Sequence, residues 1–502
     1  MIGGVSQVDL FIEKEYLMRL KVLNYLINHE TTLSEITSEL QINFKTLKVI
    51  IDQLEVDINE AQLNQEILIA TEKGKISCHA KGLSFDQLRF YYLQHSFNYK
   101  VVEAFFFRKF NGVVYYADKE FISSATALRR IAQLRPIMEN FGLSIKLSIG
   151  EFVGEETQKR MFYFYFYWYS YQFQHILYSE SWSKLDYFIE QLFEIMRMPM
   201  AYHLKRKYSL IFAITINRIL GDRYVDYEFG KKLYDHLSAH SEKFNQFYDA
   251  TVLLLREFNI SESDIIKSEI ATFYEALLTD MHLLPDSEIL NFKVLYPQIE
   301  EDSHKLYLYC ESYLGKDKVS EYKEKIQDIL FCRLLKSFKY YGDESEFIPF
   351  YKREFISLPF KKAEKEKLMN IYRDELPSYG KKDADYLILT IGIMLHELHI
   401  EISPVLNIAV LLMSHEYVVY YIKKVIEENL KDRVSITFYL EDDTDVIISD
   451  AIDSKWNKQV PVYPFVLGNE NWDEIISFLE AAIERKEWSN AHVPDGTIFP
   501  KV

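Results

Sequence analysis

The sequence YYADKEFISSATALRRIAQL at residues 115–134 carries the strongest fold signal in the chain. It predicts a short helix from Val114 to Phe121, followed by a tight turn at Ile122-Ser123. Ser124 is the candidate N-cap of a longer helix that runs from Ala125 to Leu134. A short helix, a turn and a longer helix with a polar outer face are typical of a helix-turn-helix unit.

The longer helix is expected to bury one face and to expose a polar face that fits the major groove of DNA. Its predicted core positions are Ala125, Leu128, Ile131 and Leu134. An exposed arginine can pair with guanine or grip a phosphate, and free N–H groups at a helix start favour phosphate oxygens. The strand-like stretch 145–149 predicts a wing. The residues predicted to contact DNA in this unit are Ser123, Ser124, Thr126, Arg129, Arg130, Gln133, Arg135 and Lys146.

A unit of the same layout is predicted upstream. Thr32 and Glu35 have the capping-box spacing at the start of a helix over residues 33–40. A three-residue turn leads to a longer helix over residues 44–54, and a β-hairpin within residues 67–78 reads as a wing. The residues of the longer helix that are expected to face the core are Phe44, Leu47, Ile50, Ile51 and Leu54. Those expected to contact DNA are Lys45, Thr46 and Lys48.

The net charge of −17 is unfavourable for a protein that binds a polyanion, so positive charge must be local. Residues 81–150 hold ten Lys and Arg against five Asp and Glu, which is a local charge of +5. Residues 1–60 hold five against ten, a local charge of −5. The downstream unit is therefore predicted to supply most of the affinity for phosphates. For the upstream unit, three packed helices that bind nothing remain an alternative.

A length of 502 residues predicts several domains, and few Gly and Pro residues predict a mainly α chain. Three cysteines without C-x-x-C spacing fit a reducing cytosol, and no apolar run reaches the roughly 20 residues that span a bilayer. We therefore expect a cytoplasmic protein without membrane contact. The chain shows no nucleotide-binding glycine loop and no catalytic or cofactor motif, which argues against an enzyme.

The remaining chain separates into helical and mixed parts. Residues 161–400 show helical periodicity, and the aromatic run at residues 161–171 predicts a buried helix rather than a strip that stacks on nucleic-acid bases, since no basic residues are interleaved. From Pro404 strands alternate with helices, which predicts a small α/β domain with a buried parallel strand at residues 405–413. The predicted domains are 1–82 and 83–160 (winged helix-turn-helix units), 161–287 and 288–400 (two helical bundles), and 401–502 (α/β).

The chain resembles the Mga/AtxA class of Gram-positive virulence and sugar-linked regulators. The resemblance rests mainly on residues 113–168, where a serine opens the recognition helix and Thr-x-x-Arg follows. Leu134-Arg135-Pro136, Phe141-Gly142-Leu143 and Gly154-Glu155-Glu156 are similar to that family's continuation. It implies two DNA-binding units, two helical domains of the phosphotransferase-system regulation type and an enzyme IIB-like domain. It also implies a transcription regulator of promoter DNA, more often an activator than a repressor.

The resemblance further implies regulation by phosphorylated histidine, with the phosphocarrier protein of the sugar phosphotransferase system as a partner. The candidate acceptors are His203, His396 and His282, and His304 and His399 compete with them. In the enzyme IIB-like domain, the loop at residues 413–417 has no cysteine to take a phosphoryl group, which leaves His415 as a weak substitute. Dimerisation through residues 401–502 is the better expectation for this domain.

Two alternatives belong to other classes. The segment His396-Glu397-Leu398-His399 spaces its histidines three apart, which is not the H-E-x-x-H pattern of zinc hydrolases, so no metal site is predicted. The chain can also be a protein-interaction regulator, in which acidic helical bundles bind another protein and the DNA-binding units are degenerate. In that case the arginines of residues 125–134 form an ordinary solvated helix face.

Overall fold

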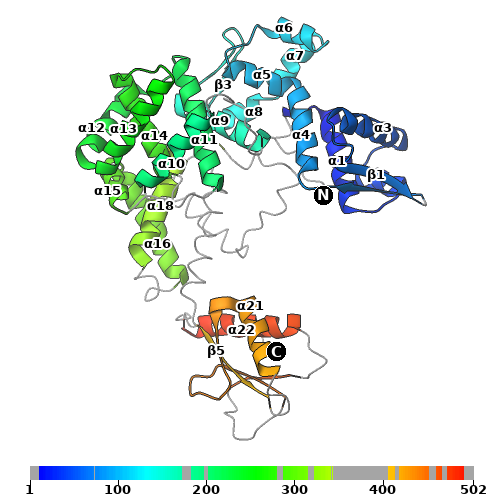
Figure 1. Cartoon of the computed structure of the whole chain (residues 1–502), viewed down its shortest axis with the longest axis vertical. Helices are drawn as coiled ribbons and strands as arrows, with labels where there is room; N and C mark the ends of the chain where they lie inside the picture. The colour runs from blue at the N-terminus through cyan, green and yellow to red at the C-terminus, as the bar shows by residue number, and fades with distance from the viewer. Residues whose placement is uncertain are drawn as a thin grey trace. The chain divides into compact units, whose positions relative to one another are not determined.

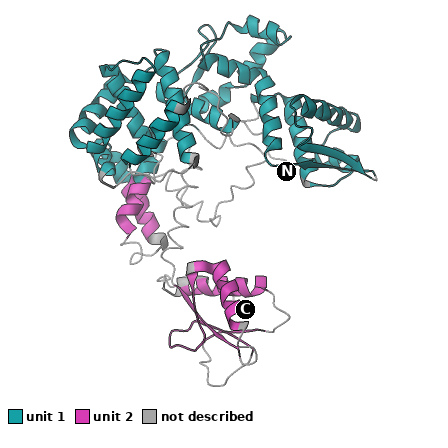
Figure 2. Ribbon diagram, viewed as in Figure 1, with its two compact units in different colours: residues 1–302, 331–389 teal, residues 303–330, 390–502 magenta. Residues whose placement is uncertain are grey.

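The computed structural model describes residues 11–72, 74–171, 182–196, 202–279, 286–314, 322–340, 342, 405–412, 418–450, 460–465 and 472–490. Within them the fold is mainly helical, with two two-stranded sheets and one four-stranded sheet (Figure 1). This confirms the predicted class, mainly α and multidomain with a small parallel sheet near the C-terminus. Contacts divide the chain into two compact units, residues 1–302 with 331–389 and residues 303–330 with 390–502 (Figure 2). The five predicted domain boundaries remain predictions.

The upstream part has the layout of a winged helix-turn-helix. It consists of α1 (Lys14–Asn28), α2 (Leu33–Glu39), α3 (Phe44–Glu60), β1 (Ile67–Glu72) and β2 (Lys75–Ala80). The predicted capping box is confirmed: the Thr32 hydroxyl accepts from the Glu35 N–H, and the Glu35 carboxylate accepts from the Thr32 N–H at 2.7 Å. The two strands form one antiparallel hairpin, so the predicted wing is also confirmed.

The prediction that Phe44 faces the core is wrong. Its side chain is 51% exposed, and the Nζ of Lys48 lies 5.1 Å from its ring centroid. The buried side chains of α3 are Leu47, Ile50, Leu54, Asp57 and Ile58. The buried stripe of α3 starts at Leu47, one turn into the helix. Phe44 is the first helical residue after the N-cap Asn43, so its side chain lies beyond the end of the core.

A buried carboxylate joins the upstream part to the next helix, α4 (Ser84–His95). Asp57 of α3 accepts from the Arg19 Nη1 of α1 at 2.6 Å and from the Tyr92 hydroxyl of α4 at 2.6 Å. Burial raises the pKa of the Tyr92 hydroxyl, and its bond to Asp57 raises it further, so Tyr92 remains a donor at neutral pH.

The downstream part repeats the layout. Its elements after α4 are α5 (Phe97–Phe106), α6 (Val113–Lys119), α7 (Ser124–Ala132), α8 (Arg135–Asn140), β3 (Ser144–Lys146) and β4 (Glu151–Val153). β3 and β4 pair antiparallel with Ile145 opposite Phe152, so the predicted wing is present. The strand is shorter than the predicted stretch 145–149, because a turn occupies the residues after Lys146.

The aromatic run forms α9 (Glu156–Tyr171), a mostly buried helix as predicted. One side of α9 packs against the downstream part. The Tyr163 ring lies 4.7 Å from that of Phe106 on α5, and the Phe162 ring lies 5.1 Å from that of Phe152 on β4. These edge-to-face contacts fix α9 to the helix-turn-helix unit.

A helical region follows α9. Its described helices are α10 (Trp182–Met196), α11 (Tyr202–Leu220), α12 (Tyr227–His240), α13 (Glu242–Glu257), α14 (Asp264–Thr279), α15 (Asp286–Leu295), α16 (Pro297–Leu314) and α18 (Lys323–Lys339). The backbone of α12 passes close to α14, because a Cβ at Gly230 would lie 2.7 Å from the Cβ of Ser268. Most of the second predicted bundle, residues 288–400, lies beyond the described residues, which stop at 342 in this region.

The C-terminal part is the predicted small α/β domain. Its elements are β5 (Leu406–Leu411), α21 (Val418–Leu430), η5 (Lys431–Arg433), β6 (Val434–Thr437), β7 (Val446–Ser449), β8 (Val462–Pro464) and α22 (Trp472–Asn490). All four strands are parallel in the order β6-β5-β7-β8. Ile408 and Ile448 of the sheet pack with Ile422 of α21 and Leu479 of α22 in one core. The loop at residues 413–417, with His415, lies outside the described residues.

Gly150 in the wing is expected to be intolerant of a side chain. Its φ is +60°, and a Cβ there would lie 2.7 Å from the Cβ of Phe110. We expect Gly150→Ala to lower the free energy of unfolding by about 2–4 kcal/mol, because left-handed strain adds to overpacking. Urea denaturation followed by circular dichroism measures this loss.

The matched control is Gly82→Ala. Gly82 also has a left-handed φ of +53°, but nothing lies within 4 Å of its added Cβ. It should lose only about 1–2 kcal/mol, the strain alone. Equal losses for the two variants would contradict the packing of Phe110 on the wing.

Candidate nucleic-acid interface

The turn between α6 and α7 fixes where the candidate recognition helix begins. Phe121 lies in this turn with a φ of +53°, and its side chain is 97% exposed. Ser123 is the N-cap, since its hydroxyl accepts from the Thr126 N–H at 3.1 Å. The prediction of Ser124 as the N-cap is therefore wrong by one residue, and Ser124 is the first residue of α7.

The buried side of α7 also differs from the predicted one. Ala127 and Ile131 of α7 are buried, and Leu134 follows on the same side. Ala125 and Leu128 were predicted to be core positions and are instead exposed, Leu128 by 47%. The core needs only a narrow stripe at four-residue spacing, because α7 packs along one line against α5 and α6. The solvent face of α7 is thus wider and more apolar than the sequence predicts.

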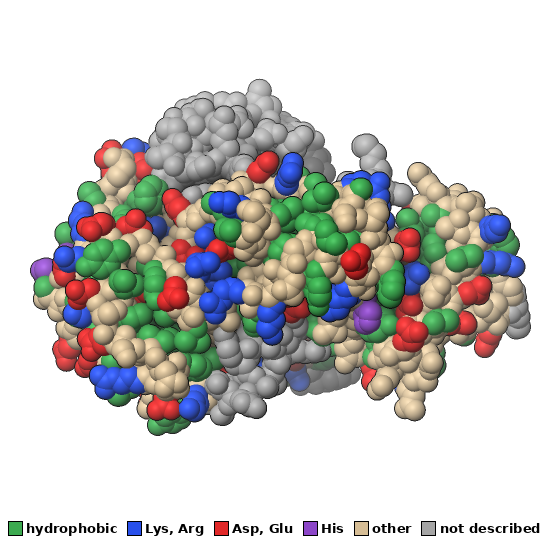
Figure 3. Space-filling view, turned by 90° about the horizontal axis from the view of Figure 1, so that it is seen from above, with side chains coloured by type: hydrophobic (Ala, Val, Ile, Leu, Met, Phe, Trp, Pro, Cys, Tyr) green, Lys and Arg blue, Asp and Glu red, His purple; other side chains and the backbone are tan. Residues whose placement is uncertain are grey.

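Most of the predicted DNA contacts of this unit lie at the surface. Ser124, Arg129, Gln133 and Arg135 are exposed on α7 and at the start of α8, and Lys146 is exposed on β3. Ser123 is exposed at the cap, and Thr126 is half-buried. Within α7 there is no acidic residue to oppose the arginines. Figure 3 views the molecule from the end where α6 and α7 lie in Figure 1, and shows basic side chains interspersed with acidic and apolar ones.

Arg130 has a structural contact that the sequence does not reveal. Its Nη1 lies 2.9 Å from the Oε1 of Glu13, and both side chains are partly buried. The same Glu13 oxygen accepts from the Phe97 N–H at the start of α5 at 2.8 Å. Arg130 therefore ties α7 to the residue that precedes α1, and it is less exposed than predicted. The two residues are 117 positions apart, so no local pattern signals the pair.

The upstream unit exposes its predicted contacts in a less favourable setting. Lys45, Thr46 and Lys48 are all exposed on the first turns of α3. The Thr46 N–H donates to the side chain of the N-cap Asn43 at 2.8 Å, as the Thr126 N–H does to Ser123 on α7, so this bond does not distinguish the two units. Further along the same helix, Asp52, Glu55 and Glu60 are exposed as well. Acidic side chains on the same helix weaken its attraction for phosphates.

A buried ion network joins the downstream wing to the helical region. Glu156 at the start of α9 accepts from the Arg218 Nε of α11 at 2.7 Å and from its Nη2 at 2.8 Å. Glu151 of β4 accepts from the Arg223 Nε at 2.7 Å and from its Nη2 at 2.9 Å. Arg218 also reaches Glu151, at 3.2 Å, and so links the two carboxylates.

The network continues into α14 through Arg160. The two Nη atoms of Arg160 lie 2.6 and 3.1 Å from the carboxylate of Glu269. Glu269 also accepts from the Val225 N–H at 2.7 Å, and the Arg160 Nη2 donates to the carbonyl of Arg223 at 3.0 Å. Sequence reasoning noticed Glu156 but missed its partners. The available signal was Arg218, a lone charged residue in the mostly apolar second half of α11.

The network shifts the ionisation of its carboxylates. Burial alone would raise the pKa of Glu156, but hydrogen bonds from Arg218 and the charges of Arg160 and Arg218 outweigh it, and the pKa falls below 4.5. The pKa of Glu151 is lowered in the same way: burial raises it, and the Arg223 hydrogen bonds and nearby cations outweigh burial. Both carboxylates are therefore ionised at neutral pH.

The candidate phosphorylation sites are unevenly described. His203 is the second residue of α11, the helix that also carries Arg218. His304 lies exposed on α16, where its Nδ1 is 2.8 Å from the Nε2 of Gln327. His282, His396 and His399 lie outside the described residues. In the part of the chain that the structure describes, no cluster of three or more His, Cys, Asp or Glu is placed to hold a metal ion, and no helix is long and apolar enough to cross a membrane.

Helix, turn, helix and wing in this order define a DNA-binding domain of the winged helix-turn-helix class. Residues 81–167, from just before α4 to near the end of α9, match the family model described as the Mga helix-turn-helix domain. This match confirms the helix-turn-helix part of the resemblance and points to DNA binding and regulation of transcription. No curated protein matches the chain.

Loss of the Glu156 charge should destabilise the junction between the wing and the helical region. We expect Glu156→Gln to lower the free energy of unfolding by about 3–5 kcal/mol, because Arg218 and Arg160 lose a buried counter-ion. The adjacent, exposed Glu155 provides the control, and Glu155→Gln should cost less than about 1 kcal/mol. Similar losses for both would show that the network contributes little.

The same variant tests the pH dependence. The pKa of Glu156 is lower in the folded state than its ordinary value, so its stabilisation is full above pH 4.5 and is lost as the pH falls through the folded-state pKa. The unmodified protein should lose stability more steeply below pH 4.5 than Glu156→Gln does. Parallel acid-unfolding curves would contradict this assignment.

Proposed function

We propose that the chain is a transcription regulator that binds double-stranded promoter DNA with α7 in the major groove. The single observation that carries the proposal is an exposed, acid-free α7 within a domain that matches the Mga helix-turn-helix model. A capped helix start with exposed Ser123 and Ser124 offers hydroxyl and N–H donors to phosphates. Such a target places the protein in the cytoplasm, where bacterial DNA lies.

Arg129 is the central specificity residue of this proposal. It is exposed on α7, while the neighbouring Arg130 is bound to Glu13. An arginine fork can read guanine through O6 and N7. The exposed Ala125 and Leu128 on the same helix suit the methyl groups of thymine. Gln133, Arg135 and Lys146 then contact the flanking phosphates, and Arg130 and Thr126 contribute by orienting α7.

The upstream unit is a secondary contact in this proposal. Lys45, Thr46 and Lys48 reach the DNA backbone, but the acidic residues farther along α3 limit their contribution. The net charge of −17 means that the rest of the protein repels DNA, so binding depends on the few cations near α7.

Regulation by histidine phosphorylation is a further part of the proposal. His203 is the preferred acceptor, because a phosphate of charge about −1.5 to −2 there would sit in the first turn of α11, where the helix dipole favours it. The phosphoryl donor would be the phosphocarrier protein of the sugar phosphotransferase system. His396 and His282 remain alternative acceptors, and we propose that the regulator activates transcription.

Self-association through residues 401–502 is proposed from an exposed aromatic surface. Tyr420, Tyr421 and Tyr439 are 69%, 57% and 62% exposed, and Leu440 is exposed by 43%. The Tyr420 ring lies 5.0 Å from that of Phe438, so the residues of α21 and those following β6 form one surface. Contiguous apolar surface of this kind marks an interaction site, and a second copy supplies an identical surface around a two-fold axis.

The DNA-binding test uses Arg129→Ala with DNA recovered by chromatin immunoprecipitation. We expect binding to weaken about tenfold or more, because a bidentate base contact or a phosphate contact is lost. Fluorescence anisotropy across a salt series measures the affinity, and loss of one phosphate contact would reduce the salt slope by about 0.9.

Arg256→Ala provides the control, since Arg256 is also exposed, on α13, outside the domain that matches the Mga model. It should bind as the unmodified protein does. If folded Arg129→Ala keeps full affinity, α7 does not read DNA, and the protein-interaction regulator becomes the better assignment.

The dimer test uses Tyr420→Asp combined with Tyr439→Asp. We expect sedimentation velocity to show a shift from dimer to monomer, because two aromatic side chains of the proposed interface are replaced by charged ones. Leu253→Asp, at a position that is 62% exposed on α13, should remain dimeric. A chain without residues 404–502 that still sediments as a dimer would place the interface elsewhere.

A further inference from the structure

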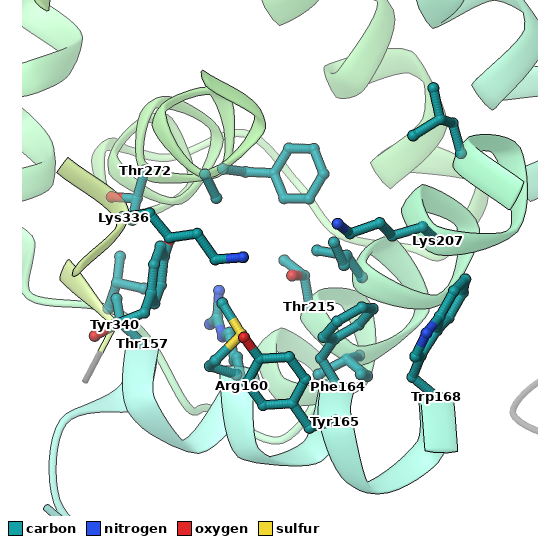
Figure 4. A pocket seen from close by; sticks show the side chains of 17 residues that line it. Thr157, Arg160, Phe164, Tyr165, Trp168, Lys207, Thr215, Thr272, Lys336 and Tyr340 are labelled. Atoms are coloured by element: carbon teal, nitrogen blue, oxygen red, sulfur yellow. The ribbon is translucent and has the colours of Figure 1, made fainter. Parts of the chain in front are cut away.

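A cavity of about 280 Å³ lies on the side of α9 opposite the helix-turn-helix unit. Residues of α9, α11, α14 and the C-terminal end of α18 line it, as Figure 4 shows. On α9 the lining residues recur at helical spacing, at Arg160, Phe164 and Trp168. The α9 residues that contact the helix-turn-helix unit, such as Phe162 and Tyr163, lie between these lining residues in the sequence. One helix therefore forms a wall of the cavity and a wall of the DNA-binding unit.

The cavity lining is cationic, which is unusual in so acidic a chain. Arg160, Lys207 and Lys336 line it, and none of the other described lining residues is Asp or Glu. In Figure 4 the amines of Lys207 and Lys336 point into the cavity from opposite sides. Lys336 is buried, with only 9% of its surface exposed. Arg160 is held in the wall by Glu269 and Glu156.

The rest of the lining is aromatic and apolar. Phe164, Tyr165 and Trp168 of α9 form one wall, and Phe273 of α14 lies among the others. The Lys207 Nζ is 5.9 Å from the Phe164 ring centroid, so a positive charge borders the aromatic surface directly. Concave sites that combine apolar walls with a few converging polar groups are typical of small-ligand pockets.

We propose that this cavity binds a small organic anion. Its carboxylate or phosphate monoester lies between Lys207 and Lys336 near Arg160, and its apolar or aromatic part packs against Phe164 and Trp168. Two ammonium groups match an anionic head group, and the aromatic walls match a flat apolar body. The site does not depend on the proposed DNA-binding function, because it rests on the cavity alone.

Occupancy of the cavity is coupled to the helix-turn-helix unit in this proposal. Arg160 lines the cavity and at the same time bonds Glu156 and Glu269. An anion beside Arg160 changes the charge balance of the network that joins β4, α9, α11 and α14. A ligand that favours one arrangement of α9 then changes DNA affinity, and the effect is reciprocal.

The binding test uses phenyl phosphate and benzoate as the two anionic probes and benzyl alcohol as the uncharged comparison. Isothermal titration calorimetry on the full chain measures affinity. We expect at least one anion to bind with a Kd of about 1 mM or tighter, and benzyl alcohol to bind at least tenfold more weakly. The stronger of the two anions shows whether the site prefers phosphate or carboxylate.

Lys336→Met and Lys207→Met remove one charge each and keep most of the apolar stem. Each should weaken the anion at least tenfold and leave benzyl alcohol unchanged. Lys232→Met, at an exposed position on α12 outside the cavity, should bind as the unmodified chain does. Should Lys336→Met fail to fold, as its melting temperature will reveal, Lys207→Met still decides the question.

Three results would overturn the proposal. They are no binding of either anion at 1 mM scale, equal binding of benzyl alcohol, and anion binding that survives both cavity substitutions. DNA affinity measured with the bound anion at saturation tests the coupling separately. A change of about fivefold or more supports coupling, and unchanged DNA affinity with demonstrated anion binding overturns the coupling alone.

Discussion

The arrangement of the DNA-binding unit on the helical region depends on the buried ion network around Glu156. The Glu156 carboxylate at the start of α9 accepts hydrogen bonds from the Nε and Nη2 of Arg218. One turn further along α9, Arg160 pairs with Glu269 of α14. A buried charge that loses its partner costs several kcal/mol, so the network tolerates only one register of α9 against α11 and α14. Arginine suits this task because its planar fork makes two parallel bonds to one carboxylate.

The same network, together with the separate Glu13–Arg130 pair, explains how an acidic chain can keep a DNA-binding surface small and local. Arg130, Arg160 and Arg218 are all engaged with carboxylates, so they add little to the field outside the protein. The exposed cations left on α7 and β3 are few, above all Arg129 and Lys146. In this arrangement the total charge keeps most of the surface away from DNA, while a short helix without acidic residues can still approach the phosphates.

Helix α9 connects the structural and the proposed regulatory features. One side of α9 packs into an aromatic core with α5 and β4, and the other side forms a wall of the cationic cavity. The aromatic packing on the first side fixes α9 to the helix-turn-helix unit, so a movement of α9 would be passed on to that unit. In the two proposals, a signal that acts on α11, either a ligand in the cavity or a phosphoryl group on His203, would reach the wing through α9 and the Glu156–Arg218 pair.

The sequence alone determined the element order, both helix-turn-helix layouts and the α/β character of the C-terminal part, because periodicity, caps and turns are local properties. The capping box at Thr32 and the parallel sheet after Pro404 were predicted on this basis. Only the tertiary structure decided which face of α7 is buried, that Phe44 is exposed, and that Arg130 binds Glu13. The Glu13–Arg130 and Glu156–Arg218 pairs join residues 117 and 62 positions apart. Side chains that meet across such distances leave no pattern in the neighbouring sequence, so folding alone brings them together.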